Sequence, residues 1–308
     1  MNQYKKGVIY TIIGGACWGI SGTCGEYLCT FKGMDTRLLT DIRLLGAGLV
    51  LCLFMFWRYR PNVKLFLKTP NAVLHCIVFG IGGLMFTQYA YLTAIAKTNA
   101  GTATVLQYLS AIFVLLIVCL RKRKLPVLRE NIAIVSCLVG TFLVATHGSF
   151  TSLYISKQGL FWGFLAAVAA TLYILIPQQL LADWGSIIPT GIGMLTGGIA
   201  FFFIMRVWKI SVKLDLVTVI ITLLIVLVGT VLAFTMFLKG TSLVGPARGN
   251  MLGCVEPLMA TVCSAVFLDT VFLPMDIIGF GFIMRQFLYW QRVSYKKVMC
   301  GLNKKILK

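Results

Sequence analysis

Apolar segments of about 20 residues recur along almost the whole chain, and they restrict the fold more than any other feature. Each is long enough to cross the ~30 Å hydrocarbon core of a bilayer as a helix. Only 12% of the residues are charged, whereas about twice that fraction is usual in a soluble domain. The sequence therefore predicts an all-α integral membrane protein. The clear segments are 7–29, 36–57, 72–96, 100–120, 131–147, 158–181, 187–206, 216–238 and 246–268.

A tenth apolar segment begins at Pro274 and ends early. After Met284 the chain continues RQFLYWQRVSYKKVMCGLNKKILK, which is basic and aromatic. About ten apolar residues are too few to cross a bilayer, so we expect ten spans with an incomplete last one. Two explanations stay open for residues 285–308. The first is a native amphipathic tail on the cytoplasmic face. The second is an out-of-frame tail produced by a one-base deletion near codon 285, because one possible choice of codons, read in the shifted frame, encodes an apolar continuation of the span.

The basic residues indicate how the chain is oriented. The net charge is +19, but most Lys and Arg residues lie in short segments between apolar runs and form no nucleic-acid-binding face. Lys5, Lys6, and the clusters at 58–68 and 121–129 fall on one side if the spans alternate. That side is then the cytoplasm. We expect a multi-pass protein of the cytoplasmic membrane with no nucleic-acid partner.

The sequence offers no motif for a metal or an organic cofactor. Ten cysteines are scattered, most of them inside apolar runs, without a C-x-x-C pair. Neither H-E-x-x-H nor a P-loop occurs, and an ATP-driven pump would need the latter. We therefore expect no cofactor, no metal and no enzymatic activity.

Residues 90–113 and 236–259 resemble one another when the chain is slid by 146 residues. In both copies a span ends, a tight loop follows, and a span rich in small residues begins. This indicates two five-span repeats, at 1–150 and 151–284. Because five is odd, the second copy enters the membrane from the opposite side. Such inverted repeats are typical of secondary transporters, whose substrate site lies near the midplane between the halves.

Glu256 and Pro257 interrupt an apolar segment at this expected interface. A carboxylate within a membrane span is costly, and such residues often serve function; Pro257 predicts a helix break. Glu256 is a candidate for substrate contact or proton coupling, and capping of freed backbone groups is the alternative. Gln107 of span 4 occupies a face that corresponds to that of Glu256.

Arg43, two turns inside span 2, is a second candidate for contact with substrate. Alternatively it pairs with Glu26 or Asp41. Glu26 is expected at the outer rim of span 1. Asp41 and Arg37 lie four residues apart and are candidates for an interfacial ion pair.

Five motifs together resemble the EamA-type, ten-span members of the drug/metabolite transporter superfamily. The resemblance covers about residues 1–284. It implies alternating access through a central cavity, driven by a proton or substrate gradient, with Trp18, Tyr108 and Asn250 as further candidates for cavity lining. Ser110-Ala111 stands where the family often has a proline step. The motifs are Trp18-Gly19, Arg43 in DIRLLGAG, GIGMLTGG (191–198), VEPLMA (255–260) and FLDT (267–270).

The function expected from these features is secondary transport of a small metabolite, such as an amino acid or amine. Multidrug efflux is the alternative within transport. An intramembrane serine hydrolase is the alternative outside it, because GISG (19–22) matches the G-x-S-G motif and would make Ser21 the nucleophile. The expected partners are a small-molecule substrate, membrane lipid and a coupling proton, and a homodimer is the expected assembly if the chain oligomerises.

Overall fold

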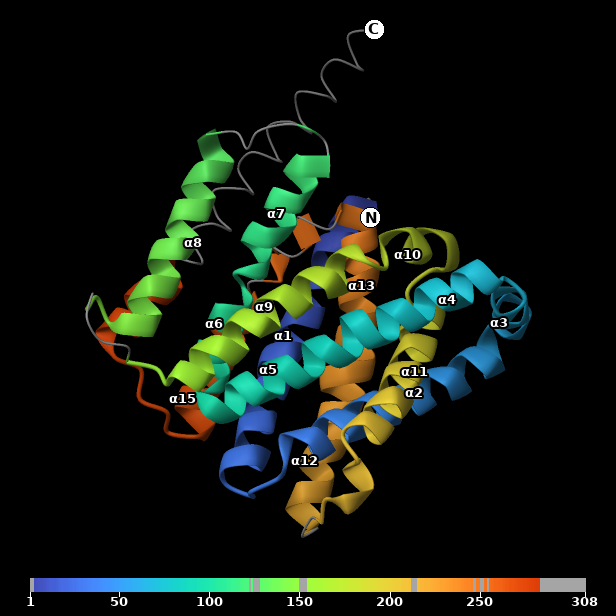
Figure 1. The fold of residues 1–308 in the computed structure, drawn as a ribbon, viewed down its shortest axis with the longest axis horizontal. Coiled ribbons are helices and arrows are strands. Elements are labelled where there is room, and N and C mark those ends of the chain that lie inside the picture. The colour runs from blue at the N-terminus through green and yellow to red at the C-terminus, as the bar shows by residue number, and fades with distance from the viewer. Residues whose placement is uncertain are drawn as a thin grey trace, which may run out of the picture.

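A computed structural model shows an all-helical bundle (Figure 1). It describes residues 3–121, 123, 128–149, 154–211, 215–245, 248–249, 252–253 and 255–282, and none of these residues lies in a strand. The predicted all-α class is therefore confirmed for the described chain. The tail 285–308 and Asn250 lie outside the described residues.

The first half of the chain supplies helices α1 to α8. α4, η1 and α5 follow one another without a loop and form one rod across the bundle (Figure 1). The bounds are α1 Gln3–Thr30, α2 Thr36–Arg58, α3 Arg60–Leu67, α4 Pro70–Val78, η1 Phe79–Met85, α5 Phe86–Lys97, α6 Ala100–Gln107, α7 Ser110–Arg121 and α8 Leu128–Thr146.

The second half continues with α9 to α15. Residues 274–282 are also helical and follow α15. The bounds are α9 Lys157–Leu175, α10 Gln178–Trp184, α11 Ile187–Ile204, η2 Val207–Lys209, α12 Leu216–Val226, η3 Leu227–Leu232, α13 Ala233–Val244 and α15 Val255–Phe267.

Among the described residues, seven helical stretches are long and apolar enough to cross a membrane. They coincide with seven of the predicted spans, and α8 and the shorter α15 fall in the two others. The chain is therefore a multi-pass membrane protein by length and composition. The seven are Gln3–Thr30, Thr36–Arg58, Pro70–Lys97, Ala100–Arg121, Lys157–Trp184, Ile187–Ile204 and Leu216–Val244.

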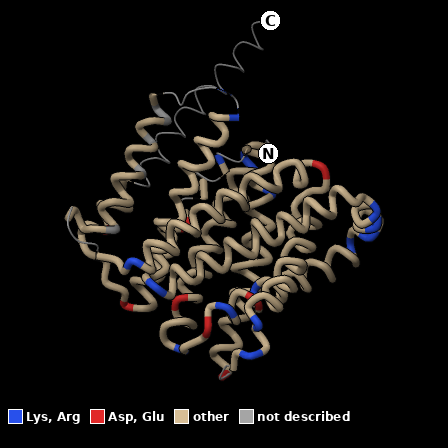
Figure 2. The backbone as a smooth tube through the Cα atoms, viewed as in Figure 1, with Lys and Arg blue, Asp and Glu red and all other residues tan. Residues whose placement is uncertain are grey.

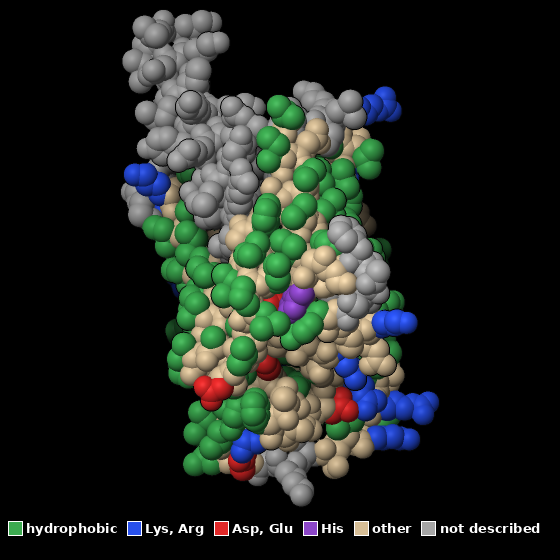
Figure 3. Space-filling model, turned by 90° about the vertical axis from the view of Figure 1, so that its left-hand side faces the viewer, with side chains coloured by type: hydrophobic (Ala, Val, Ile, Leu, Met, Phe, Trp, Pro, Cys, Tyr) green, Lys and Arg blue, Asp and Glu red, His purple; other side chains and the backbone are tan. Residues whose placement is uncertain are grey.

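The surface agrees with a lipid environment. Charged residues gather at the ends of the bundle and on α3, while the middle of the helices carries few (Figure 2). Apolar side chains cover most of the middle of the face seen in Figure 3. Many leucine, isoleucine and phenylalanine side chains of the described residues are exposed, which suits contact with hydrocarbon.

Local sequence explains several helix ends. Asn99 and Ser156 cap α6 and α9, where their side-chain oxygens accept hydrogen bonds from the backbone N–H groups of Thr102 and Gly159. Such caps satisfy N–H groups that have no partner within the helix. Pro177 separates α9 from α10, because proline cannot donate the next helical hydrogen bond.

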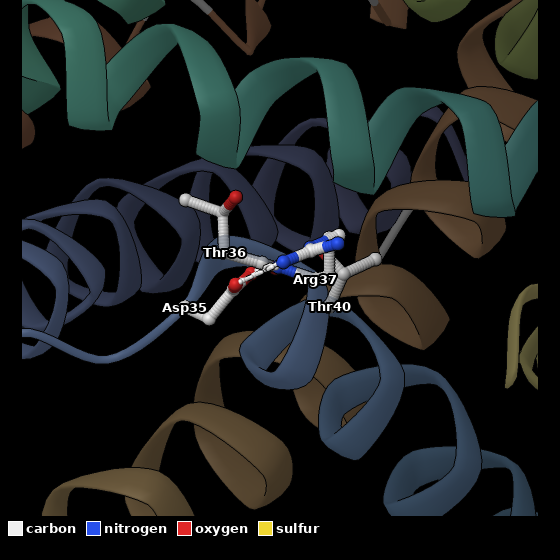
Figure 4. Close-up of polar contacts among 4 residues, drawn as sticks. All are labelled: Asp35, Thr36, Arg37 and Thr40. Atoms are coloured by element: carbon white, nitrogen blue, oxygen red, sulfur yellow. Dashed lines mark hydrogen bonds and ion pairs between the residues drawn. The ribbon is translucent and has the colours of Figure 1, made fainter. Parts of the chain in front are cut away.

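The start of α2 corrects one expectation. Arg37 pairs with Asp35, at 2.6 Å between Nη2 and Oδ2, and not with Asp41 (Figure 4). Asp35 is the N-cap of α2 and also accepts from the backbone N–H of Arg37 at 2.7 Å. As N-cap, Asp35 therefore already holds its carboxylate beside the Arg37 guanidinium. Asp41 is buried, and its Oδ1 has no hydrogen-bond partner.

The two halves are interleaved. α1 packs against α13 and α15, α9 packs against α5 and α6, and α2 packs against α11. Glycines permit these close approaches: a Cβ on Gly240 would lie 2.2 Å from the Thr11 hydroxyl. A Cβ on Gly19 would lie 2.6 Å from the Glu256 carbonyl oxygen. Small residues of this kind let helix backbones meet within a membrane.

Candidate functional site

Two of the expected spans, 100–120 and 246–268, each contain a turn. α6 ends at Gln107 and a turn at Tyr108 precedes α7. A turn at Gly253 precedes α15, whose first turn contains Pro257. Proline is tolerated in a first turn, because its missing N–H would have no partner there. The turn near Pro257 therefore precedes the proline and is not caused by it. The turn at residues 108–109 contains no proline.

A buried cavity lies beside both turns. Five of the predicted site residues line it: Trp18, Arg43, Gln107, Tyr108 and Glu256. They come from α1, α2, α6, α15 and the turn after α6, so both halves of the chain contribute. The sixth, Asn250, lies outside the described residues. The free space accommodates on the order of three water molecules, so a larger ligand requires the helices to move apart.

Several lining residues were not expected from the sequence. Thr87 and Gln88 are polar residues within the apolar segment 72–96. Their polarity inside a predicted span could have marked them as candidates for cavity lining. The aromatic and aliphatic ones carried no such signal, because they resemble ordinary packing residues. Those missed are Thr87, Gln88, Tyr91, Ser110, Ala170, Tyr173, Ile174, Phe234 and Phe237.

Arg43 and Glu256 bring opposite charges to the cavity. Arg43 is 2% exposed and Glu256 is 5% exposed. Arg43 Nε donates to the Thr230 hydroxyl at 3.3 Å, and the Tyr108 hydroxyl donates to Glu256 Oε2 at 3.5 Å. Neither Glu26 nor Asp41 pairs with Arg43, so both proposed partners were wrong. Buried charges of this kind are costly unless they are paired or bind a ligand.

The cavity presents polar atoms that lack hydrogen-bond partners. Among the described residues that line it, these are Trp18 Nε1, Arg43 Nη1, Thr87 Oγ1, Gln88 Oε1 and Nε2, Gln107 Oε1 and Tyr173 OH. Most buried polar groups in proteins are hydrogen-bonded. A concentration of donors and acceptors around one space therefore points to a polar ligand there.

Aromatic rings form the apolar part of the lining. The Trp18 ring lies 4.8 Å from Phe234 and 4.5 Å from Phe237, measured between centroids. Tyr173 packs edge-on against Trp18 at 6.0 Å. Pockets that combine apolar walls with a few polar groups are typical of small-molecule sites.

Glu26 was expected at a rim, and the structure buries it instead. Its side chain is 7% exposed, and Oε2 accepts from the Ala100 backbone N–H and the Ser264 hydroxyl, both at 2.9 Å. Ala100 begins α6, where the helix dipole favours a negative charge. One carboxylate therefore joins α1, α6 and α15.

The contact of Glu26 with Ala100 and Ser264 forms a second layer of residues beside the cavity, called the Glu26 layer here. Glu26, Ala100 and Ser264 each lie eight residues along their helices from Trp18, Tyr108 and Glu256 respectively. At 1.5 Å per residue the two layers are roughly 12 Å apart. The Glu26 layer therefore holds together, on one side of the cavity, the same three segments that line it.

Ser21 lacks the surroundings of a nucleophile. Its hydroxyl has no hydrogen-bond partner and lies against Gly229. His75 Nε2 bonds to the Ile176 carbonyl at 2.8 Å, and His147 Nε2 bonds to Asp276 at 2.9 Å. Neither histidine is placed to activate Ser21 by hydrogen bonding, which a serine hydrolase requires.

Comparison with known proteins fits a transporter. The sequence model of the EamA-like transporter family matches residues 5–146 and 157–285, nearly the whole described bundle. The chain belongs to the EamA-like transporter family. This confirms the resemblance seen in the sequence motifs, and the family is one of transporters.

Two further similarities agree. A Salmonella typhimurium (strain LT2) protein named as an uncharacterized inner membrane transporter, YicL, is 36% identical over 281 residues, covering 91% of this chain and 93% of that protein. A crystal structure described only as that of a protein matches with a TM-score of 0.67 at 16% identity. It covers 94% of this chain and 98% of the other, and at that identity it shows the fold alone.

Proposed function

We propose that the chain is a secondary transporter that moves a small metabolite, such as an amino acid, an amine or a related compound, across the cytoplasmic membrane by alternating access. One observation carries this proposal. Arg43 and Glu256 face one buried cavity without pairing to each other, among several polar atoms that lack partners. A small ligand with its own donors, acceptors and charge would satisfy these groups.

We also propose ten spans in two inverted repeats. The two π-helical segments, η1 and η3, begin at Phe79 and Leu227, close to the 146-residue slide found in the sequence. The turns at Tyr108 and Gly253 follow the same slide. The packing of α1 on α13 and α15 parallels the packing of α9 on α5 and α6. Discontinuous helices beside a central site are common in transporters with such repeats.

The two halves would supply the alternating motion. In the arrangement described, the Glu26 layer closes one side of the cavity through hydrogen bonds among α1, α6 and α15. With the amino terminus in the cytoplasm, α1 runs outward and this layer lies on the external side. Opening to the outside then requires the Glu26 bonds to break, while the glycine contacts of α1 with α13 stay closed at the other end.

Glu256 is the residue we assign to coupling. It is buried, contacts Tyr108, and begins α15 at the broken point of its span. Proton uptake at this carboxylate would remove its attraction for a cationic group of the substrate. Arg43 would hold an anionic group, and the rings of Trp18 and Tyr173 would contact the apolar part.

The proposal places the protein in the cytoplasmic membrane. The relative named above is described as an inner membrane transporter. The apolar surface and the basic segments at 58–68 and 121–129 support the same location and orientation.

The first test is a search for the substrate. Purified protein is heated with individual amino acids, amines, nucleotide precursors and cationic dyes, and the unfolding temperature is recorded. We expect one chemical class to raise it in the wild type and not in Arg43→Gln. A rise caused by many unrelated dyes would favour multidrug efflux, and no rise with any compound in either protein would contradict the cavity as a binding site.

A further inference from the structure

A basic stripe runs along the short helix α3, outside the cavity. Arg60, Lys64 and Lys68 follow at steps of four residues, so their side chains share one face of this helix and its C-cap. Arg58 lies just before it, with its guanidinium carbon 5.8 Å from the Tyr59 ring centroid. All four cationic side chains are exposed. Figure 2 shows this group at the edge of the bundle where α3 joins α2 to α4.

The opposite face of α3 anchors it to the bundle. Val63 and Phe66 are fully buried in a cluster with residues of α2, α4, α10 and α11. The Phe66 ring packs edge-on against Trp184 at 5.1 Å. Because this face is fixed, the basic stripe has a constant position relative to the spans.

Apolar side chains near the stripe are exposed as well. Trp57 is 81% exposed, Leu65 60% and Leu67 50%. Exposed tryptophan beside basic residues is typical of the membrane–water interface. α3 therefore lies where its leucines reach the edge of the hydrocarbon and its cations reach the headgroups.

The cations of α3 have no carboxylate partner among the described residues. In contrast, Lys32 pairs with Asp215 at 2.5 Å, and Arg37 pairs with Asp35, both beside the ends of α1 and α2 away from α3. Asp183 of the neighbouring α10 is the acidic residue on the adjoining element, and no ion pair joins it to the stripe. The four charges thus remain available for a ligand.

We propose that Arg58, Arg60, Lys64 and Lys68 form a binding site for the phosphate groups of anionic phospholipids. Guanidinium and ammonium groups bind phosphate oxygens through charge-assisted hydrogen bonds. Basic residues beside a membrane attract anionic lipid, and the contributions of several such residues add. The site holds α3, and with it the α2–α4 connection, against one leaflet.

The test measures thermal unfolding of the purified full-length protein in detergent, with added phosphatidylglycerol or phosphatidylcholine. We expect phosphatidylglycerol to raise the unfolding temperature more than phosphatidylcholine. In the triple variant Arg60→Gln, Lys64→Gln and Lys68→Gln, the apparent affinity for phosphatidylglycerol should fall roughly a hundredfold. Added salt should weaken the wild-type effect.

Two controls make the outcome decisive. Lys97→Gln, Lys157→Gln and Lys209→Gln together remove the same charge elsewhere on the exposed surface and should keep the lipid response. The double variant Arg60→Lys with Lys64→Arg keeps the charge of the stripe and should retain most of the lipid response. It provides a test of the stripe if the triple variant fails to fold. An equal response in the two triple variants, or equal effects of both lipids on the wild type, would overturn the proposal.

Discussion

Arg43 and Glu256 reach one cavity from α2 and α15, and no ion pair joins them. Arg43 instead donates to the Thr230 hydroxyl, and Glu256 accepts from Tyr108. Two opposite charges that are held apart can each attract a different part of one small molecule. Unpaired buried charges are costly, so under the proposed function this arrangement lowers stability in exchange for binding.

Replacing Arg43 by methionine should separate these two effects. Arg43→Met fills a similar volume without burying a charge, so we expect unchanged or raised thermal stability. We expect the substrate-induced rise in unfolding temperature to disappear. Thr230→Val removes only the hydroxyl that orients the guanidinium and should weaken substrate binding less. Normal substrate binding by Arg43→Met would exclude Arg43 from the site.

Glu26 gives a prediction about stability. Glu26→Ala leaves the Ala100 N–H and the Ser264 hydroxyl without their partner, at a cost of about 1–3 kcal/mol. Glu26→Gln keeps an oxygen that accepts from both groups, so it should lose less. Chemical or thermal unfolding in detergent compares the three proteins. Equal stability of Glu26→Ala and the wild type would show that the Glu26 layer is not formed.

The sequence predicted the helices far better than it predicted individual contacts. Hydropathy located the seven long apolar helices of the described chain, because each must match the bilayer thickness. Arg43 and Glu256 stood out because charges are rare in such segments. Glu26 was misplaced because its partner, the start of α6, is a backbone group that no residue type reveals. Pairing of Arg37 with Asp41 was wrong because Asp35, as N-cap, lies closer.

Asp35 should confer stability that depends on acid pH. The Arg37 guanidinium, together with the Arg37 backbone N–H, holds the pKa of the Asp35 carboxyl below its ordinary value. A lowered folded-state pKa contributes stability above the unfolded value, near pH 4, and that stability is lost as pH falls through the folded pKa. Asp35→Asn keeps the cap and removes this dependence, whereas Asp35→Ala also loses the cap, about 1 kcal/mol. Unfolding temperatures measured from pH 6 downward test this; parallel curves for wild type and Asp35→Asn would contradict it.

Close packing of α1 against α13 predicts an effect of a single methyl group. Gly240→Ala would place Cβ 2.2 Å from Thr11 Oγ1 and 2.7 Å from its backbone nitrogen. Because the backbone must shift, we expect a loss of about 1–3 kcal/mol. Gly281→Ala is the matched control, since nothing lies within 4 Å of the added methyl group, and it should be neutral or slightly stabilising. Equal unfolding temperatures for the two variants would show that the helices do not approach so closely.

Transport by the reconstituted protein is the most direct test of secondary transport through the cavity. Vesicles loaded with the compound that raises the unfolding temperature are diluted into a trace of the same compound in labelled form, and uptake is followed over time. We predict that the wild type concentrates the label by exchange. Glu256→Gln lacks the carboxylate proposed to attract the cationic group of the substrate, so its exchange rate should be at least tenfold lower although it folds. Undiminished exchange by Glu256→Gln would exclude its role in transport, and uptake by the wild type no faster than in protein-free vesicles would contradict secondary transport.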